Sequence, residues 1–328
     1  MKVYSIVNNS YKINAYKGNI HLTSFMGNDE VNIQKPKPQE ATLAQKITAS
    51  LAKIKSDKYV KLSKDLLQES GQIKGKATLI LEQAKEAQRA AKELSEANSN
   101  LFLNEQVTCS QSLIVYDTNL DGKTMDAYVF DTKTRTLKQY MKNVNVNDSS
   151  IKADECFSFG ENGELVAFDR YFAEALEGHE RYKKSFERYI FDGCNLEQCY
   201  SQYNETIGKT ISFDDVLMFD DNELSYYVEN GYINSCENVQ TFGVQMVFND
   251  NQIQVCSNGV SVHSDGEQEH RKRFIYSDKK LQQVQYDAHV IEDECASSRQ
   301  TIEYVNNKPF CCRISNDSNG ETVAYFKK

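Results

Sequence analysis

The sequence contains no long apolar run. No stretch approaches the roughly eighteen consecutive apolar residues that a membrane-spanning helix requires. Residues 1–10 also lack the basic region and apolar core of a secretory signal peptide. We therefore expect no transmembrane segment and no classical secretion.

Motifs of the common enzyme classes are also missing. The five histidines form no metal-binding pair at helical spacing, and the chain has no glycine-rich phosphate loop, nucleophile elbow or HExxH motif. Adjacent carboxylates such as Asp214 and Asp215 would point to opposite sides of a strand, which is a poor geometry for shared acid–base chemistry. The sequence thus predicts no catalytic residues and a protein that is not an enzyme.

Basic residues are scarce in the last two thirds of the chain. Residues 1–100 contain 16 Lys+Arg against 10 Asp+Glu, whereas the remaining residues contain 22 against 37. Binding to phosphate backbones needs a surplus of Lys and Arg, so we expect no nucleic-acid partner for this part of the chain.

The sequence does contain a repeat. An apolar residue, any residue, and then Phe or Tyr recur at intervals of 28 to 32 residues. We call the last residue of each triplet its aromatic anchor; the anchors are Phe130, Phe159, Phe191, Phe219, Phe248, Tyr276 and Tyr304. A fixed period of this length is typical of a repeat architecture.

Each repeat has the pattern of a β-hairpin. Residues two apart point to the same face of a strand, so the apolar residue and the anchor share one face. A polar turn follows, then usually Leu or Ile, with another regular position three residues later. In the last repeat these two positions are assigned to Phe310 and Arg313, so that repeat departs from the rule as an end cap would.

Residues 126–313 resemble the YD repeats of the Rhs family, in which Tyr-Asp, a short turn and Leu follow one another. The equivalent dipeptides here are Phe130-Asp131, Phe191-Asp192 and Phe219-Asp220. The period is longer than in that family, and the Tyr-Asp dipeptide itself is not kept. The resemblance implies hairpins added side by side and carries over no functional residue.

All nine cysteines follow residue 100, without a CxxC pair or zinc-ligand spacing. Cys199, Cys256 and Cys312 each lie eight residues after an anchor, which indicates small residues that face the sheet interior. We expect reduced, buried thiols, with disulfides between neighbouring repeats as the alternative.

The first hundred residues follow other patterns. Residues 1–38 are polar and end in Lys-Pro-Lys-Pro, so we expect a flexible leader. In residues 39–100 a first run has its apolar residues on one helical stripe, namely Leu43, Ile47, Leu51 and Ile54. A second run, from Ile80 to Leu94, has heptad spacing.

Ser70, Gly71 and Gly75 interrupt these two runs. The simplest interpretation is an antiparallel helical hairpin or coiled coil over residues 39–100, which packs on the sheet or forms a homo-oligomer. A helix lying on a membrane surface is the alternative, although the Ala-rich stripe of the second run is too weakly apolar for strong insertion.

The segment Asp117-x-Asn119-x-Asp121-Gly122 matches the first half of an EF-hand loop, in which oxygen ligands at positions 1, 3 and 5 converge on Ca²⁺. The pattern then departs, because position 12 is Tyr128 rather than a bidentate Glu. An Asp/Gly hairpin turn that holds no ion is the alternative.

Residues 117–126 also resemble the short Asp-x-Asn-x-Asp-Gly calcium loops of bacterial repeat and surface proteins, where a later Asp replaces the Glu. The resemblance implies a Ca²⁺ cofactor held by side-chain oxygens, with a backbone carbonyl from Lys123. The implied side-chain ligands are Asp117, Asn119, Asp121 and Asp126.

Together these patterns predict an α+β fold, in which an N-terminal α-helical hairpin precedes an antiparallel β-hairpin repeat domain over residues 101–328. The repeat domain is expected to be a curved sheet or a barrel-like meander. We expect a non-enzymatic binding or assembly protein whose repeat surface recognises a protein or a glycan, with the helices for anchoring or oligomerisation.

Two other functions stay open from the sequence. A curved sheet could enclose a cavity and carry a lipid or other small ligand, or the protein could be an exported effector. Free thiols favour the cytoplasm, whereas a calcium loop favours an external location through non-classical export.

Overall fold

The computed structural model describes residues 39–103, 111–118, 124–144, 153–172, 182–205, 211–235, 238–263, 267–291, 296–316 and 320–327. They belong to the compact unit formed by residues 38–328. The predicted leader, residues 1–38, lies outside the described residues. One α-helix, α1 (Leu43–Ala97), precedes a short 3-10 helix, η1 (Leu101–Leu103). No helix in the described ranges is both long and apolar enough to cross a membrane.

In the part of the chain that the structure describes, seventeen strands make up the sheet. In chain order they are β1 (Gln39–Glu40), β2 (Ser112–Thr118), β3 (Met125–Asp131), β4 (Leu137–Val144), β5 (Glu155–Phe159), β6 (Leu165–Tyr171), β7 (Tyr182–Asp192), β8 (Asn195–Glu205), β9 (Ile211–Asp220), β10 (Glu223–Ser235), β11 (Asn238–Asn249), β12 (Gln252–His263), β13 (Glu267–Ser277), β14 (Lys280–Ile291), β15 (Ala296–Val305), β16 (Lys308–Asn316) and β17 (Gly320–Tyr325).

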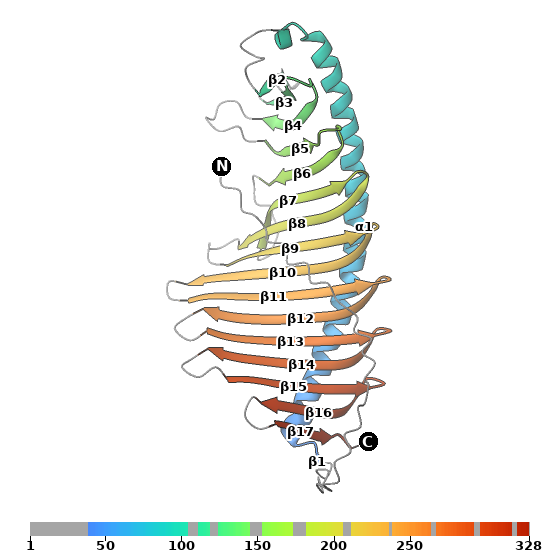
Figure 1. Cartoon of the computed structure of the whole chain (residues 1–328), viewed down its shortest axis with the longest axis vertical. Helices are drawn as coiled ribbons and strands as arrows, with labels where there is room; N and C mark the ends of the chain where they lie inside the picture. Colours follow the sequence, from blue (N-terminus) through green and yellow to red (C-terminus); the bar gives the residue numbers. More distant parts are fainter. Residues whose placement is uncertain are drawn as a thin grey trace, which may run out of the picture. The chain divides into compact units, whose positions relative to one another are not determined.

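The strands form a meander in which each of β2 to β16 pairs antiparallel with its successor (Figure 1). The short strand β1 pairs parallel with β17, where Gln39 lies opposite Ala324. Within the described residues β2 and β17 do not pair with each other. The prediction of an antiparallel hairpin-repeat sheet is confirmed, and the barrel-like alternative is wrong because the sheet is open.

The aromatic anchors form the core. All seven are buried, and so is the residue two positions before each of them. These residues share one apolar cluster with α1, so they lie on the inner face of the sheet, the face that α1 covers. The hairpin reading of the repeat is therefore confirmed at every anchor.

A β-bulge in each hairpin explains the regular position three residues after the Leu or Ile. In the repeat anchored by Phe248, that anchor lies opposite Ile253, and Val247 lies opposite Val255, so Gln254 is the extra residue. Because the bulge inserts one residue, the next inward side chain falls three positions on, at Cys256, rather than two. Equivalent bulges follow the turns of the other six hairpins.

The same register corrects the assignment of the last repeat. Tyr304 lies opposite Pro309, and Ile302 lies opposite Cys312, so Phe310 is the bulged residue. Phe310 is exposed, and Cys312, not Arg313, takes the inward position. The last repeat therefore follows the same pattern as the others, with both positions one residue earlier than predicted. The prediction missed this because Pro309 stands where the other repeats have Leu or Ile.

Four hairpin turns have two central residues with positive φ. The pairs are Asp221 and Asn222, Asp250 and Asn251, Asp278 and Lys279, and Asn306 and Asn307. Positive φ at both positions defines a type I′ turn, whose twist matches that of the flanking strands, and Asn and Asp tolerate it best. The polar turn residues of the sequence are thus required by the backbone conformation.

The helical segment is one continuous helix of 55 residues, so the predicted helical hairpin is wrong. Gly71 and Gly75 lie within the helix, and a methyl group added at either would meet no other atom within 4 Å. Two exposed glycines weaken a helix by only about 1 kcal/mol each. Burial along the whole sheet outweighs that cost. A capping box of Thr42 and Gln45 starts the helix.

The face of α1 that packs on the sheet follows a heptad. Its buried residues alternate in steps of three and four: Ala49, Ala52, Ser56, Tyr59, Ser63, Leu66, Ser70, Ile73, Ala77, Ile80, Ala84, Ala87 and Ala91. The predicted second run, from Ile80, lies on this face. The predicted stripe of Leu43, Ile47, Leu51 and Ile54 instead lies on the solvent side. In the described residues, the heptad face of α1 packs against the sheet and not against a second helix, as it would in a coiled coil.

Helix and sheet share one register. The Tyr304 hydroxyl donates to the carbonyl oxygen of Ala49 at 2.8 Å, and the Tyr276 hydroxyl donates to that of Ser56 at 3.4 Å. Anchors 28 residues apart therefore contact helix positions seven residues apart. One position of the heptad, from Ala49 to Ala91 in steps of seven, holds only Ala or Ser. Small residues there leave room for the aromatic rings.

The predicted inward cysteines are confirmed. Cys199, Cys256 and Cys312 are buried, and no disulfide joins the six cysteines among the described residues. Burial raises the pKa of the Cys199 thiol to about 12. These thiols therefore act as small apolar side chains.

Replacing Gly71 or Gly75 with Ala should stabilise the protein. Each change removes backbone freedom from the unfolded chain without a clash, so we expect the free energy of unfolding to rise by about 0.5–1 kcal/mol. Urea denaturation measures it. The control is Gly243→Ala in β11, whose Cβ would lie 2.8 Å from the carbonyl oxygen of Glu229 and should destabilise. A loss of stability in Gly71→Ala would contradict a continuous helix.

Candidate functional site

The outer face of the sheet, turned away from α1, has a hollow at its centre. Gly243 of β11 lies opposite Gly259 of β12, and their row continues to Asn230 of β10 and Arg271 of β13. Side chains alternate along a strand, and Met246 and Cys256 face inward. Gln245, Ser257 and the two glycines therefore belong to the outer face. Without side chains at the glycines, the backbone forms the floor of the hollow.

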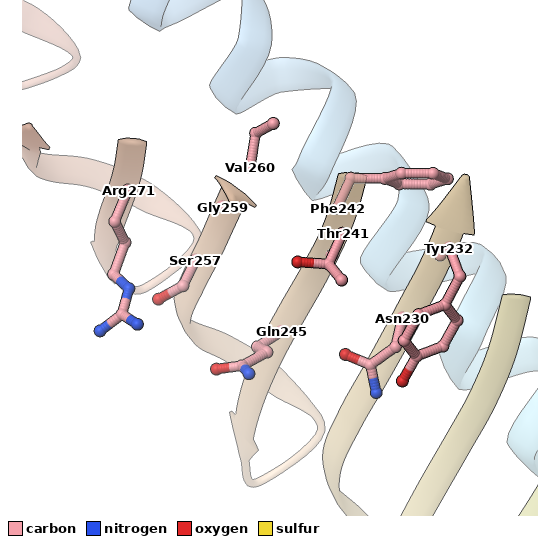
Figure 2. Close-up of a pocket in the computed structure, with 11 residues that line it drawn as sticks. Asn230, Tyr232, Thr241, Phe242, Gln245, Ser257, Gly259, Val260 and Arg271 are labelled. Atoms are coloured by element: carbon pink, nitrogen blue, oxygen red, sulfur yellow. The ribbon is translucent and has the colours of Figure 1, made fainter. Parts of the chain in front are cut away.

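The hollow encloses about 320 Å³. Figure 2 shows Arg271, Ser257, Gln245 and Asn230 extending from four successive strands. The residues that line the hollow are Asn230, Gly231, Tyr232, Thr241, Phe242, Gly243, Gln245, Ser257, Gly259, Val260 and Arg271. Eight of them belong to the outer face, and Gly231, Phe242 and Val260 belong to the inner face. Arg271 is the only charged residue in this lining.

Close packing fixes the glycines and the neighbouring aromatic residues. The Phe242 ring lies against Gly231 on the inner face, where any side chain at position 231 would collide with it. Asn258 Nδ2 donates to the Gly243 carbonyl oxygen at 3.3 Å. Tyr232 is 42% exposed, so one aromatic ring with a hydroxyl borders the hollow.

This lining offers a defined set of polar groups. Asn230 and Gln245 each present a donor and an acceptor, Thr241 and Ser257 present hydroxyls, and Arg271 presents a guanidinium. Such groups around an exposed ring can bind a polar ligand that also has an apolar face. Among these lining residues no nucleophile is paired with a base.

The inner face carries a second polar cluster, along the sheet beside α1. Glu187 of β7 is only 2% exposed, and its carboxylate lies 3.1 Å from Lys184 Nζ and 3.9 Å from Lys76 Nζ of α1. Arg170 and Glu155 continue the pattern, with 2.7 Å between their charged groups. The alternating charges compensate one another in this partly buried position, so each buried carboxylate has a cation nearby.

Two carboxylates in this cluster lie directly opposite each other. Asp215 of β9 pairs with Glu229 of β10, and the Tyr227 hydroxyl lies 3.2 Å from an oxygen of each. Burial and the charge of Glu229 raise the pKa of Asp215 to about 7. Asp215 therefore holds a proton close to neutral pH, although Lys184 opposes this shift.

The predicted calcium ligands are described only in part. Asp117 of β2 lies directly opposite Asp126 of β3, so the first and last of the four candidate ligands share one face. Asp126 accepts hydrogen bonds from the Tyr140 hydroxyl at 2.5 Å and the Asn143 backbone N–H at 3.1 Å. Asn119 and Asp121 lie outside the described residues. In the described part of the chain, no group of three or more His, Cys, Asp or Glu is placed to hold a metal ion.

The residues of the hollow were missed by sequence reasoning, although a signal for them exists. Gly231, Gly243 and Gly259 each interrupt a strand pattern, and glycine within a strand often marks a close approach of another group. The cross-strand register that brings two of them side by side cannot be read from that signal alone. The Asp215–Glu229 pair was missed for the same reason.

The stability of the protein should fall as the pH rises through about 7. The raised pKa of Asp215 means that the folded protein binds a proton that the unfolded chain has already lost. Its stabilising contribution is complete below pH 3.8 and disappears as the pH rises through about 7. Urea denaturation between pH 5 and pH 8 measures this fall, which we expect to be about 2–3 kcal/mol.

Asp215→Asn should flatten that pH profile, because the amide cannot ionise. Asp250→Asn makes the same carboxyl-to-amide change in an exposed turn and should keep the wild-type slope. Equal slopes for all three proteins would show that Asp215 is already ionised when folded.

Calcium binding at residues 117–126 stays a prediction. Isothermal titration should show heat of binding at millimolar Ca²⁺, and Asp117→Asn should remove it. Tyr140→Phe, which frees Asp126 from one hydrogen bond, should preserve or strengthen binding. Absence of heat with the wild-type protein would eliminate the site.

Comparison with known proteins assigns no family to this fold. No protein-family model, no curated protein and no solved structure matches the chain.

Proposed function

We propose that the protein is a non-enzymatic binding protein whose outer sheet face recognises a glycan. The hollow over Gly243 and Gly259 carries this proposal, because an exposed aromatic ring and five hydrogen-bonding side chains border a floor of bare backbone. Of the two ligand classes expected from the sequence, protein and glycan, the chemistry of this lining favours the glycan.

A saccharide matches the chemistry of this lining. A sugar ring has an apolar C–H face, which can lie against Tyr232, and a rim of hydroxyls that both donate and accept hydrogen bonds. The amides of Asn230 and Gln245 and the hydroxyls of Thr241 and Ser257 also do both. Arg271 as the one charged lining residue makes neutral or anionic sugars the favoured class.

The dimensions of the hollow also suit a small ligand. Its volume of about 320 Å³ is at the small end of the range of roughly 300–1,000 Å³ for small-molecule sites. The sheet around it is held by paired strands on both sides, so the polar groups are fixed before a ligand arrives. A fixed arrangement lowers the entropy that binding costs.

Glycan binding should depend on Tyr232. A glycan array identifies the sugar, and titration calorimetry then compares variants. Tyr232→Ala should weaken binding about tenfold, since the ring contact is lost. Tyr116→Ala removes a similarly exposed tyrosine on the distant strand β2 and should leave the affinity within experimental error.

Loss of hydrogen bonding gives an independent arm of this test. Gln245→Ala should also weaken binding, and the bound sugar should be recovered unchanged, because no cleavage is expected. The proposal fails if the array shows no binding, or if both variants bind like the wild-type protein.

A further inference from the structure

The solvent side of the first turns of α1 is apolar. Leu43 is 74% exposed and Leu51 is 60% exposed, and Ile47 and Ile54 are more than half exposed. Their steps of four, four and three put them on one stripe, on the opposite side of the helix from Ala49, Ala52 and Ser56. Four large aliphatic side chains therefore project from the molecule without packing on the sheet.

A groove adjoins this stripe. It encloses about 740 Å³ and its floor and walls are mainly apolar. The residues that line it are Lys46, Ser50, Val305, Asn306, Lys308, Pro309, Phe310, Phe326 and Lys327. Phe310 is 46% exposed because it is the bulged residue of the last hairpin, and its ring packs edge-on against Tyr325 at 5.8 Å between centroids.

The charges around the groove are mainly positive. Three of its lining residues are lysines, and the single carboxylate of Glu40 bridges two of them, Lys46 at 3.0 Å and Lys327 at 2.6 Å. Over residues 43–64, α1 contains six lysines and one acid, Asp57. This region is therefore basic in a chain whose formal net charge is -9.

We propose that the stripe and groove together, which we call the helix-start patch, dock on an anionic lipid surface. Aliphatic and aromatic side chains flanked by lysines are the pattern of an interfacial membrane contact, in which the apolar groups enter the headgroup region and the lysines contact lipid anions. The groove has room for part of an acyl chain. This inference is independent of glycan binding on the outer face.

The alternative argued from the sequence, a homo-oligomer through residues 39–100, fits this patch less well. A second copy placed face to face would bring the lysines of one groove against those of the other, and like charges repel. An anionic surface complements the same lysines. The sequence disfavoured membrane contact because the stripe of the second run is rich in Ala. That stripe is the face of α1 that packs on the sheet, so it is not part of the helix-start patch.

Vesicle flotation tests the proposal. The full chain is mixed with vesicles of pure phosphatidylcholine or of equal parts phosphatidylcholine and phosphatidylserine. It should float only with the second, and less at high salt. Leu51→Asp and Lys308→Glu should each reduce the bound fraction about tenfold, whereas Leu79→Asp should not. Leu79 is 59% exposed on the same helix, outside the patch.

Further measurements separate the alternatives. Thermal melting should show that Leu51→Asp folds like the wild-type protein, and Tyr232→Ala should float normally if the two sites are distinct. Absence of flotation, or equal flotation with both vesicles, would overturn the proposal. A dimer that light scattering detects and that Leu51→Asp dissociates would also overturn it. So would a protein that binds a soluble fluorescent fatty acid but does not float with vesicles.

Discussion

The contact between the aromatic anchors and α1 constrains the rest of the structure. Seven residues of helix rise about 10.5 Å, and two strands of a sheet span about 9.4–9.8 Å. One heptad therefore matches one hairpin, as the hydrogen bonds of Tyr276 and Tyr304 show. Because of this match, α1 covers the inner face of the sheet along its length. The outer face can therefore carry polar residues without disturbing the core.

Much of the sheet could be predicted because its signals are local. Alternation fixes which side chains share a face, and the anchors recur regularly enough to identify the hairpins. The helix was harder, since its buried stripe includes Ser56, Ser63 and Ser70, which no hydropathy pattern selects. They are buried because the anchors leave space only for small side chains. The more apolar Leu43 and Leu51 lie on the solvent side of the helix.

The candidate sites depend on pairing between distant residues. Gly243 and Gly259 meet through the register of β11 and β12, and Asp215 and Glu229 meet through that of β9 and β10. The sequence shows glycines within strands and an excess of acids, but a bulge shifts the register by one residue in each of the seven anchor hairpins. Predicting which residues lie opposite each other requires the bulge positions, and these became evident only in the structure.

The equal pitch of heptad and hairpin limits how such a chain can change length in evolution. A duplication that added one hairpin would leave its aromatic anchor, and the apolar residue two positions before it, without a helix to cover them, unless α1 gained two turns at the matching point. Viable homologues of different length should therefore differ by coupled insertions, about 28 residues in the sheet and seven in the helix. The length of α1 therefore sets the number of repeats that the helix can cover.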